Sequence, residues 1–218
     1  MLGDLKAILS EKSFVLYTRP YELNIVGLRG NSTVPNRFDD QIHVFYKTGP
    51  VAWNYHVYNA TTDPGTYWLK NPMMQKGTAI LEQGQYLNCY ALGMHRGEYN
   101  ALVQVGPVVV IRDYDRDAVL DFFNGSRDKG YHGINIHRAS VNGTTKYVDK
   151  YSAGCQVFEN ASDFNQFIRL CGEHSTRYGN RFTYTLLDFR SVQRQKLKRI
   201  AVGSLFAASG LTAYIYLS

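Results

Sequence analysis

The sequence predicts a mainly β protein of the α+β class, in which a few short helices accompany a body of strands. Tyr and Phe are abundant, at 17 and 11 residues, among many Val, Thr and Gly residues, and this composition favours strands and turns. Short apolar runs broken by turn signals recur from residue 14 to residue 110, which is typical of antiparallel hairpins. The chain has 218 residues, 44% of them hydrophobic, so it can bury a sizeable core.

The predicted elements follow one another without an internal repeat. Residues 3–12 place Leu5, Ile8 and Leu9 on one face and predict an N-terminal helix. Strands are predicted in the runs FVLY, LNIVGLRG, QIHVFYKTG, WNYHVYNATTDPG and NALVQVGPVVVIRDYDRD. Residues 117–126 hold apolar side chains on a compact arc and end at Asn-Gly, which predicts a short helix.

A longer helix and a closing strand are predicted in the last third of the chain. Ser162 is a candidate N-cap, and apolar residues then recur at helical spacing until Gly172. The run RFTYTLLDF (181–189) predicts a closing strand. These elements belong to one main domain.

Three segments are predicted, namely a helical strap (1–13), the main domain (14–189) and a basic flank followed by a hydrophobic helix (190–218). Residues 200–218 carry no charge and, at about 1.5 Å per residue, reach about 28 Å, close to the thickness of a bilayer core. The cations before this run suit the cytoplasmic side of a membrane anchor. The small residues within it also suit tight helix packing, so a helix buried against a partner protein is the alternative.

The formal charge of +6 and the pI of about 9.1 suit an anionic partner such as cell wall, phospholipid or nucleic acid. Much of this excess comes from five cations near the C-terminus: Arg190, Arg194, Lys196, Lys198 and Arg199. The rest of the chain is nearly neutral, so nucleic-acid binding is not expected. The first residues, MLGDLKAILSEKSF, are partly acidic and lack an apolar core, which predicts synthesis in the cytoplasm without a signal peptide.

The three cysteines have no metal-type CxxC spacing, and their odd number leaves at least one thiol free. Cys89 and Cys171 fall in strand and helix patterns where a small buried residue is typical. Cys155 is different, because it ends the run Ser-Ala-Gly-Cys (152–155), which begins after 14 residues that follow His137. A neighbouring imidazole can remove the proton of a thiol and make it a nucleophile.

The residues around Cys155 provide the other candidates for the site. Gly154 leaves room for a turn and an acyl group, and the backbone N–H groups of 154 and 155 are candidate oxyanion donors. Ser152 is a candidate supporting group. Four polar or aromatic residues near the motif are candidates for substrate binding: His132, Arg138, Tyr151 and Gln156. If Cys155 is an activated thiolate, it should react rapidly with thiol reagents.

The stretch GYHGINIHRASVNGTTKYVDKYSAGCQVF (130–158) resembles the catalytic motif of the L,D-transpeptidase (YkuD-like) family, in which a His precedes a Ser/Thr-x-Gly-Cys segment. The likeness extends to YNATTDPGTYWLKNP (58–72), which is similar to the substrate-side segment of such domains. The resemblance implies a YkuD-like β-sandwich or open barrel, with Cys155 as nucleophile and His137 as base. The chain departs from the pattern at Gln156-Val157, because many members have Arg two positions after the nucleophile.

The sequence therefore predicts cysteine-dependent acyl transfer or hydrolysis on peptidoglycan stem peptides, without a cofactor. Attack on the thioester by an amine would crosslink two stems, whereas attack by water would make a peptidase. The lack of a signal peptide and the C-terminal apolar run favour a phage-associated lytic enzyme. The alternative is a non-catalytic structural protein of a virion or envelope. No metal is predicted, because neither an H-E-x-x-H nor a CxxC motif accompanies the histidines.

Overall fold

The computed structural model describes residues 1–200, and the chain divides into two compact units. The larger unit is Tyr17–Leu187, and the smaller one joins Met1–Leu16 with the described residues from Asp188 to Ile200. The predicted membrane anchor at 200–218 lies, except for its first residue, outside the described residues. Within residues 1–200, no helix is long and apolar enough to cross a membrane.

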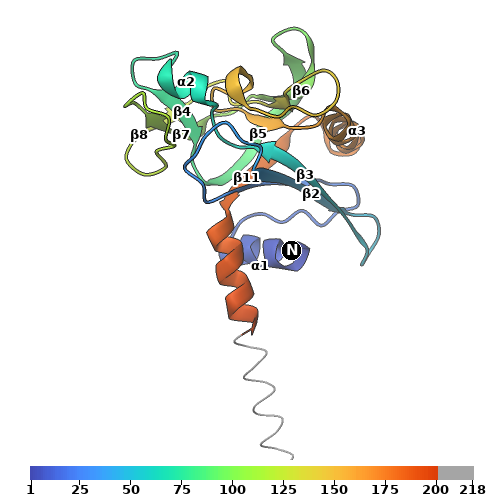
Figure 1. The fold of residues 1–218 in the computed structure, drawn as a ribbon. Coiled ribbons are helices and arrows are strands. Elements are labelled where there is room, and N and C mark those ends of the chain that lie inside the picture. The colour runs from blue at the N-terminus through green and yellow to red at the C-terminus, as the bar shows by residue number, and fades with distance from the viewer. Residues whose placement is uncertain (201–218) are drawn as a thin grey trace, which may run out of the picture. The chain divides into compact units, whose positions relative to one another are not determined.

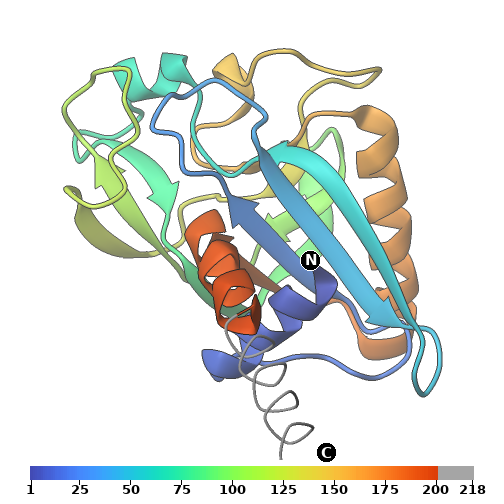
Figure 2. The ribbon, with the colours of Figure 1, turned by 60° about the horizontal axis from the view of Figure 1, so that its bottom comes forward.

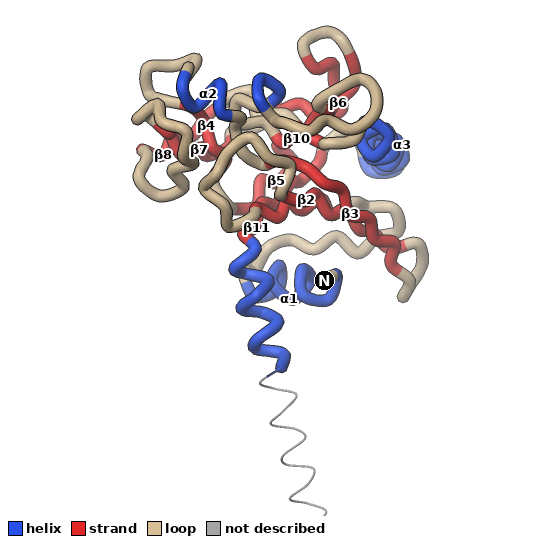
Figure 3. The backbone as a smooth tube through the Cα atoms, in the orientation of Figure 1, coloured by secondary structure: helices blue, strands red, loops and turns tan. Residues whose placement is uncertain are grey.

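A closed barrel of strands forms the body of the larger unit (Figures 1 and 3). The order around the barrel is β1 (Asn24–Arg29), β11 (Phe182–Asp188), β5 (Gly84–His95), β6 (Tyr99–Gln104), β9 (Ile136–Arg138), β10 (Gln156–Phe158), β3 (Trp53–Thr61) and β2 (Asp40–Lys47). The hairpins β2–β3 and β5–β6 are antiparallel, whereas β9 and β10 pair in parallel. The predicted α+β, mainly β class is confirmed.

The barrel is filled by aliphatic and aromatic side chains from most of its strands, among them Ile25, Val44, Tyr90, Ile136 and Phe158. Burying such side chains contributes about 1.5–3 kcal/mol each relative to exposure. The long helix α3 (Ala161–Tyr178) adds Phe164, Phe167 and Cys171 to the same core. The barrel strands and α3 therefore share one hydrophobic core.

Helix α3 begins and ends at other residues than the sequence predicts. Its N-cap is Asn160, whose side chain accepts hydrogen bonds from Ser162 N at 2.8 Å and Asp163 N at 3.2 Å. The helix continues through Gly172 to Tyr178. Asn is as good an N-cap as Ser, and burial of the apolar face offsets the low helix propensity of one glycine.

A second sheet accompanies the barrel, with β4 (Thr78–Leu81), β7 (Val108–Asp113) and β8 (Ser126–Gly130) in that order. The short helix α2 (Thr66–Lys70) lies near it. Figures 1 and 2 show this sheet on one side of the larger unit and α3 on the opposite side. The turn that carries Cys155 approaches this second sheet, because Gly154 lies against the carbonyl oxygen of Ala79 in β4.

The structure corrects two predicted elements. The run FVLY is not a strand, and residues 117–125 form a loop rather than a helix, with Ser126 beginning β8. In this loop, aspartate side chains accept hydrogen bonds from the backbone, since Asp115 Oδ1 binds Asp117 N at 3.2 Å and Asp117 Oδ1 binds Val119 N at 2.6 Å. Such local bonds compete with the helical ladder. The aspartates between the apolar residues therefore favour a loop over the predicted helix.

The smaller unit contains the predicted N-terminal helix, α1 (Leu2–Glu11), and helical residues 189–200. The sequence assigns the strap and the basic flank to separate segments, but ion pairs link them. Lys198 Nζ lies 2.6 Å from Glu11 Oε1, and Arg199 lies 2.8 Å from Asp4 Oδ1. Part of the basic flank is therefore paired within the chain.

Candidate functional site

Cys155 ends a tight turn that leads into β10. The buried Ser152 hydroxyl accepts a hydrogen bond from Gly154 N at 3.1 Å and donates one to Cys155 O at 2.8 Å. Gly154 has a φ of +122°, and a Cβ there would collide with the carbonyl oxygen of Ala79. The turn therefore requires glycine at 154 and is closed by the Ser152 side chain.

This turn leaves fewer backbone N–H donors for the predicted oxyanion hole. The N–H of Gly154 is already bound to Ser152 Oγ, so it is not free to bind a developing oxyanion. The N–H of Cys155 has no acceptor among residues 1–200. One of the two predicted backbone donors is therefore available.

The Cys155 thiol lies between two backbone groups of the preceding segment. Its Sγ accepts from Asn135 N and donates to Gly133 O, each at 3.4 Å. Burial raises the pKa of this thiol, while the Asn135 N–H and the positive charge of Arg96 act in the opposite direction with smaller effect. The resting thiol is therefore protonated at neutral pH and needs a base to become a nucleophile.

The pairing of β9 with β10 brings the Cys155 turn beside the strand of His137. Gln156 lies opposite Ile136, and Val157 lies opposite His137. Cys155 consequently lies beside Asn135, two residues before His137 along the neighbouring strand. In the described part of the chain, no hydrogen bond joins Cys155 Sγ to His137.

The hydrogen bonds of His137 determine which nitrogen carries the proton. Its Nδ1 lies 2.8 Å from the carbonyl oxygen of Arg138, which can only accept, so Nδ1 donates and Nε2 keeps a lone pair. The Tyr99 hydroxyl donates to the same carbonyl at 3.3 Å. Burial lowers the pKa of His137 to about 3, with smaller contributions from His95 and Arg96. His137 is therefore neutral at pH 7 and can accept a proton through Nε2.

A second histidine, His95 at the end of β5, stacks on His137 with ring centroids 4.2 Å apart and an interplanar angle of 20°. The Asn135 side chain fixes its tautomer. Asn135 Oδ1 accepts from Gln104 N at 2.9 Å, so its Nδ2 donates to His95 Nδ1 at 3.1 Å. Neutral His95 therefore carries its proton on Nε2.

Sequence reasoning did not assign His95 to the site. The polar run MHRGEYN (94–100) is a signal for a cleft loop, but nothing in it specifies a partner. The link to His137 follows from the strand order β5–β6–β9, which places the His95 end of β5 near β9. Only the fold provides this information.

His132 lies in a different environment from His137. Its Nδ1 accepts from the Arg112 guanidinium at 3.1 Å, and its Nε2 donates to the carbonyl oxygen of Asp128 at 3.0 Å. Arg112 also pairs with the Asp128 carboxylate at 2.9 Å. Both ring nitrogens of His132 are therefore in use.

The other predicted substrate-binding residues are spread over different surroundings. Gln156 is fully buried, and its amide binds Tyr184 Oη at 2.8 Å and Gly154 O at 3.2 Å, so it has no surface for a substrate. The Arg138 guanidinium lies 4.2 Å from the centre of the Tyr99 ring. Tyr151 is exposed on the 3₁₀ helix η1 (Asp149–Tyr151). Arg138 is half-buried and Tyr151 is exposed, so only these two offer side-chain surface to a substrate.

A cavity of about 380 Å³ lies next to the Cys155 turn and has mixed apolar and charged walls: Trp68, Thr78, Arg112, Asp128, His132 and Ala153. Its volume is in the range of ligand sites. Ala153 belongs to the turn, and His132 comes one residue before Gly133, whose carbonyl accepts from the Cys155 thiol. The cavity and the thiol therefore share two chain segments.

The three cysteines are free thiols, and Cys89 and Cys171 are buried, as expected for structural residues. Within residues 1–200, no three His, Cys, Asp or Glu side chains stand together in a position to hold a metal ion. Comparisons with family models, curated proteins and solved structures found no match.

Proposed function

We propose that the chain is a cysteine-dependent acyl-transfer enzyme acting on peptidoglycan stem peptides, with Cys155 as nucleophile and His137 as general base. The observation that carries the proposal is the parallel pairing of β9 and β10, which sets the Cys155 turn beside the His137 strand. The resemblance of the 130–158 motif to L,D-transpeptidases supports the same pair. A YkuD-like origin of the barrel, with β4–β7–β8 as a second sheet, is part of this proposal.

The first half-reaction forms a thioester. His137 Nε2 takes the proton of Cys155 Sγ, and the sulfur attacks the carbonyl carbon of an amide next to a diamino-acid residue. The Cys155 N–H is the available backbone donor for the oxyanion. The C–N bond then breaks as His137 returns the proton to the leaving nitrogen.

The second half-reaction frees the enzyme. Water or an amine attacks the thioester carbonyl, His137 takes the proton of the attacking group, and the C–S bond breaks as that proton returns to sulfur. Water gives hydrolysis and an amine gives a crosslink. We favour hydrolysis, and a phage-associated lytic role, as the specific form of the proposal. Product analysis separates the two reactions.

The resting pair is a neutral thiol and a neutral imidazole, so proton transfer has to accompany substrate binding. The low pKa of His137 reflects mainly burial, with smaller contributions from His95 and Arg96, and a thiolate formed beside the imidazolium would offset that cost by its opposite charge. Binding of a substrate over the thiol would also displace its hydrogen bond to Gly133 O. This explains how a protonated thiol can serve as a nucleophile.

The cavity beside Ala153 is the proposed binding site for the stem peptide. Arg112 and Asp128 present opposite charges at its wall, and the diamino acids of stem peptides carry both amine and carboxylate groups. The adjacent Trp68 and His132 supply an apolar face and a polar edge. A short zwitterionic peptide fits this lining.

The test is turnover of purified muropeptides by the full chain and by Cys155→Ala, Cys155→Ser and, as a matched control, Cys89→Ala. We expect both Cys155 variants to lose all measurable turnover while their circular dichroism stays unchanged, because only the nucleophile is removed. Cys89→Ala should keep its activity. Intact mass after treatment with a carbapenem should show one adduct that depends on Cys155. Near-wild-type turnover by a folded Cys155→Ala protein would refute the assignment.

A non-catalytic interaction protein is the second candidate. It is favoured by one observation, namely that burial raises the pKa of the Cys155 thiol, which in the resting state donates a hydrogen bond to Gly133 O. In that case neither a carbapenem adduct nor turnover would be found for the wild-type chain. The same mass and turnover measurements therefore decide between the two candidates.

A further inference from the structure

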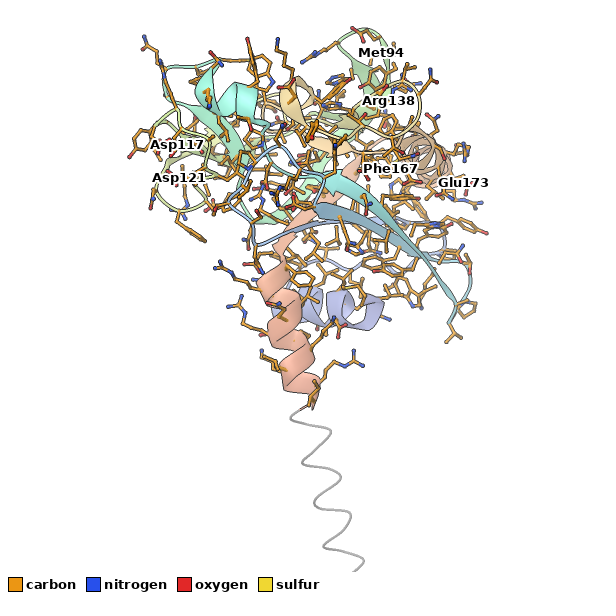
Figure 4. All side chains as sticks on the ribbon, viewed as in Figure 1. Met94, Asp117, Asp121, Arg138, Phe167 and Glu173 are labelled. Atoms are coloured by element: carbon orange, nitrogen blue, oxygen red, sulfur yellow. The ribbon has the colours of Figure 1, made fainter. Side chains whose placement is uncertain are left out.

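The loop that joins β7 to β8 carries four aspartates in the pattern D-x-D-x-D-x-x-x-D: Asp113, Asp115, Asp117 and Asp121. Calcium-binding loops use carboxylates at the first, third, fifth and ninth positions of such a run. Figure 4 labels Asp117 and Asp121 on this loop. The spacing alone is not sufficient for a site, but the state of the first aspartate adds an independent observation.

Asp113 is almost completely buried, with 1% of its surface exposed. Its Oδ2 accepts a hydrogen bond from Asp121 N at 3.1 Å, which directs the carboxylate toward the loop. Its Oδ1 is buried and has no hydrogen-bond partner among residues 1–200. A buried carboxylate oxygen without a partner is costly, and a cation seated in the loop would satisfy it.

The charge balance of the loop also calls for a cation. In the described part of the chain, none of the four aspartates forms an ion pair with Lys or Arg. Bringing the four carboxylates together without a counter-ion would be unfavourable, and a bound cation would offset their repulsion.

We propose that the β7–β8 loop binds one Ca²⁺ ion through the carboxylates of Asp113, Asp115, Asp117 and Asp121. Each of the first three uses one oxygen for a backbone N–H, at Asp121, Asp117 and Val119 respectively. The second oxygen of Asp113 has no partner among residues 1–200, and the Asp115 carboxyl lies within hydrogen-bond reach of the Asp121 carboxyl. The carboxylates do not converge on one point as they stand. Binding therefore draws the exposed Asp115 and Asp117 inward over the buried Asp113.

The donor set selects the metal. All four ligands are carboxylates, and hard oxygen donors suit Ca²⁺ and Mg²⁺ rather than Zn²⁺. An irregular loop accommodates the six to eight oxygens and variable geometry of Ca²⁺, whereas Mg²⁺ requires a near-ideal octahedron. Ca²⁺ is therefore the expected ion.

The site is independent of the proposed acyl transfer, but it adjoins the cavity. Asp113 in β7 pairs with Thr78 in β4. Thr78 lines the cavity, and so does Arg112, which precedes Asp113 in the chain. An ion that fixes the end of β7 would therefore also hold this wall. Loss of acyl-transfer activity would not remove ion binding.

The test uses Tb³⁺ as a luminescent substitute for Ca²⁺, because Tyr114 lies in the loop between Asp113 and Asp115 and can sensitise the ion. The full chain should give a saturable Tb³⁺ signal that Ca²⁺ displaces at least tenfold more effectively than Mg²⁺. Its Tm should rise in Ca²⁺ relative to excess EGTA. Absence of a saturable signal, or equal displacement by Mg²⁺, would overturn the proposal.

Two variants locate the ion. Asp117→Asn changes an exposed side chain and keeps an oxygen for Val119 N, and Asp113→Asn keeps an oxygen for Asp121 N. Each should weaken Tb³⁺ binding at least tenfold with unchanged circular dichroism. Glu173→Gln, on the exposed face of α3 (Figure 4), is the charge-matched control and should leave binding unchanged. Unchanged affinity in a folded Asp117→Asn protein would also overturn the proposal.

Discussion

His132 and His137 lie five residues apart in one segment, yet their surroundings give them different chemistry. Both nitrogens of His132 are occupied, by Arg112 and by the Asp128 carbonyl. His137 uses Nδ1 alone and keeps the lone pair of Nε2. The difference teaches that a candidate base is recognised by a ring nitrogen without a hydrogen-bond partner, and not by its residue type alone.

The strongest way to break this comparison is to remove each ring in turn. We expect His137→Ala to lower kcat/KM on muropeptides by about 10² to 10⁴, the usual contribution of a general base. His132→Ala should cost much less, because it removes a wall of the cavity and no proton acceptor. Equal losses of kcat/KM in the two variants, or a larger loss in His132→Ala, would show that His137 is not the general base.

A finer test concerns His95, which we regard as a positioning residue because it contacts His137 rather than the thiol. His95→Phe keeps a stacked ring but removes the acceptor for Asn135 Nδ2. We expect about a tenfold loss of rate, within the range for residues that orient a catalytic group, and a shifted pH profile of Cys155 alkylation. His95→Gln, which can still accept from Asn135, should restore part of the rate. An unchanged pH profile would reduce His95 to a packing residue.

The smallest effect concerns stability in acid. The folded-state pKa of His137 is depressed to about 3, from an ordinary value of 6.5, so its neutral form favours folding above pH 6.5. This contribution is lost as the pH falls from 6.5 toward 3, because the unfolded chain binds the proton first. His137→Gln should therefore flatten the fall of Tm between pH 7 and pH 4. His43, whose pKa is lowered by burial to about 4, should leave part of the slope in place, and an equally steep slope in His137→Gln would contradict the prediction.

The sequence predicts several strands well, because β1, β2, β3, β6 and β7 coincide with apolar runs bounded by turn signals. It predicts β9 and β10 only as a His and a Cys in suitable positions, since three-residue strands leave too short a pattern. Closure of the barrel depends on contacts between distant strands, which no local pattern records. The fold class could therefore be predicted from the sequence, whereas the strand order could not.

The candidate site shows the same limit. Ser152 and Gly154 could be placed from the motif, because their roles in the turn are local. Gln156 could not, because its burial follows from Tyr184 across the barrel. The β7–β8 loop was also mispredicted. Its apolar residues suggested a helix, but the carboxylates of Asp115 and Asp117 accept hydrogen bonds from the backbone two residues on.

Two glycines that lie close to the backbone of neighbouring segments bear on how distant relatives of this chain can be recognised. A side chain at Gly154 would collide with the backbone of Ala79, and one at Gly77 would collide with the backbone of Asp113. Both have positive φ values, which makes any other residue doubly unfavourable. As homologous chains diverge, the side chains lining the cavity can change with the substrate, but these two positions cannot. A search profile for relatives should therefore give Gly77 and Gly154 weight equal to that of His137 and Cys155.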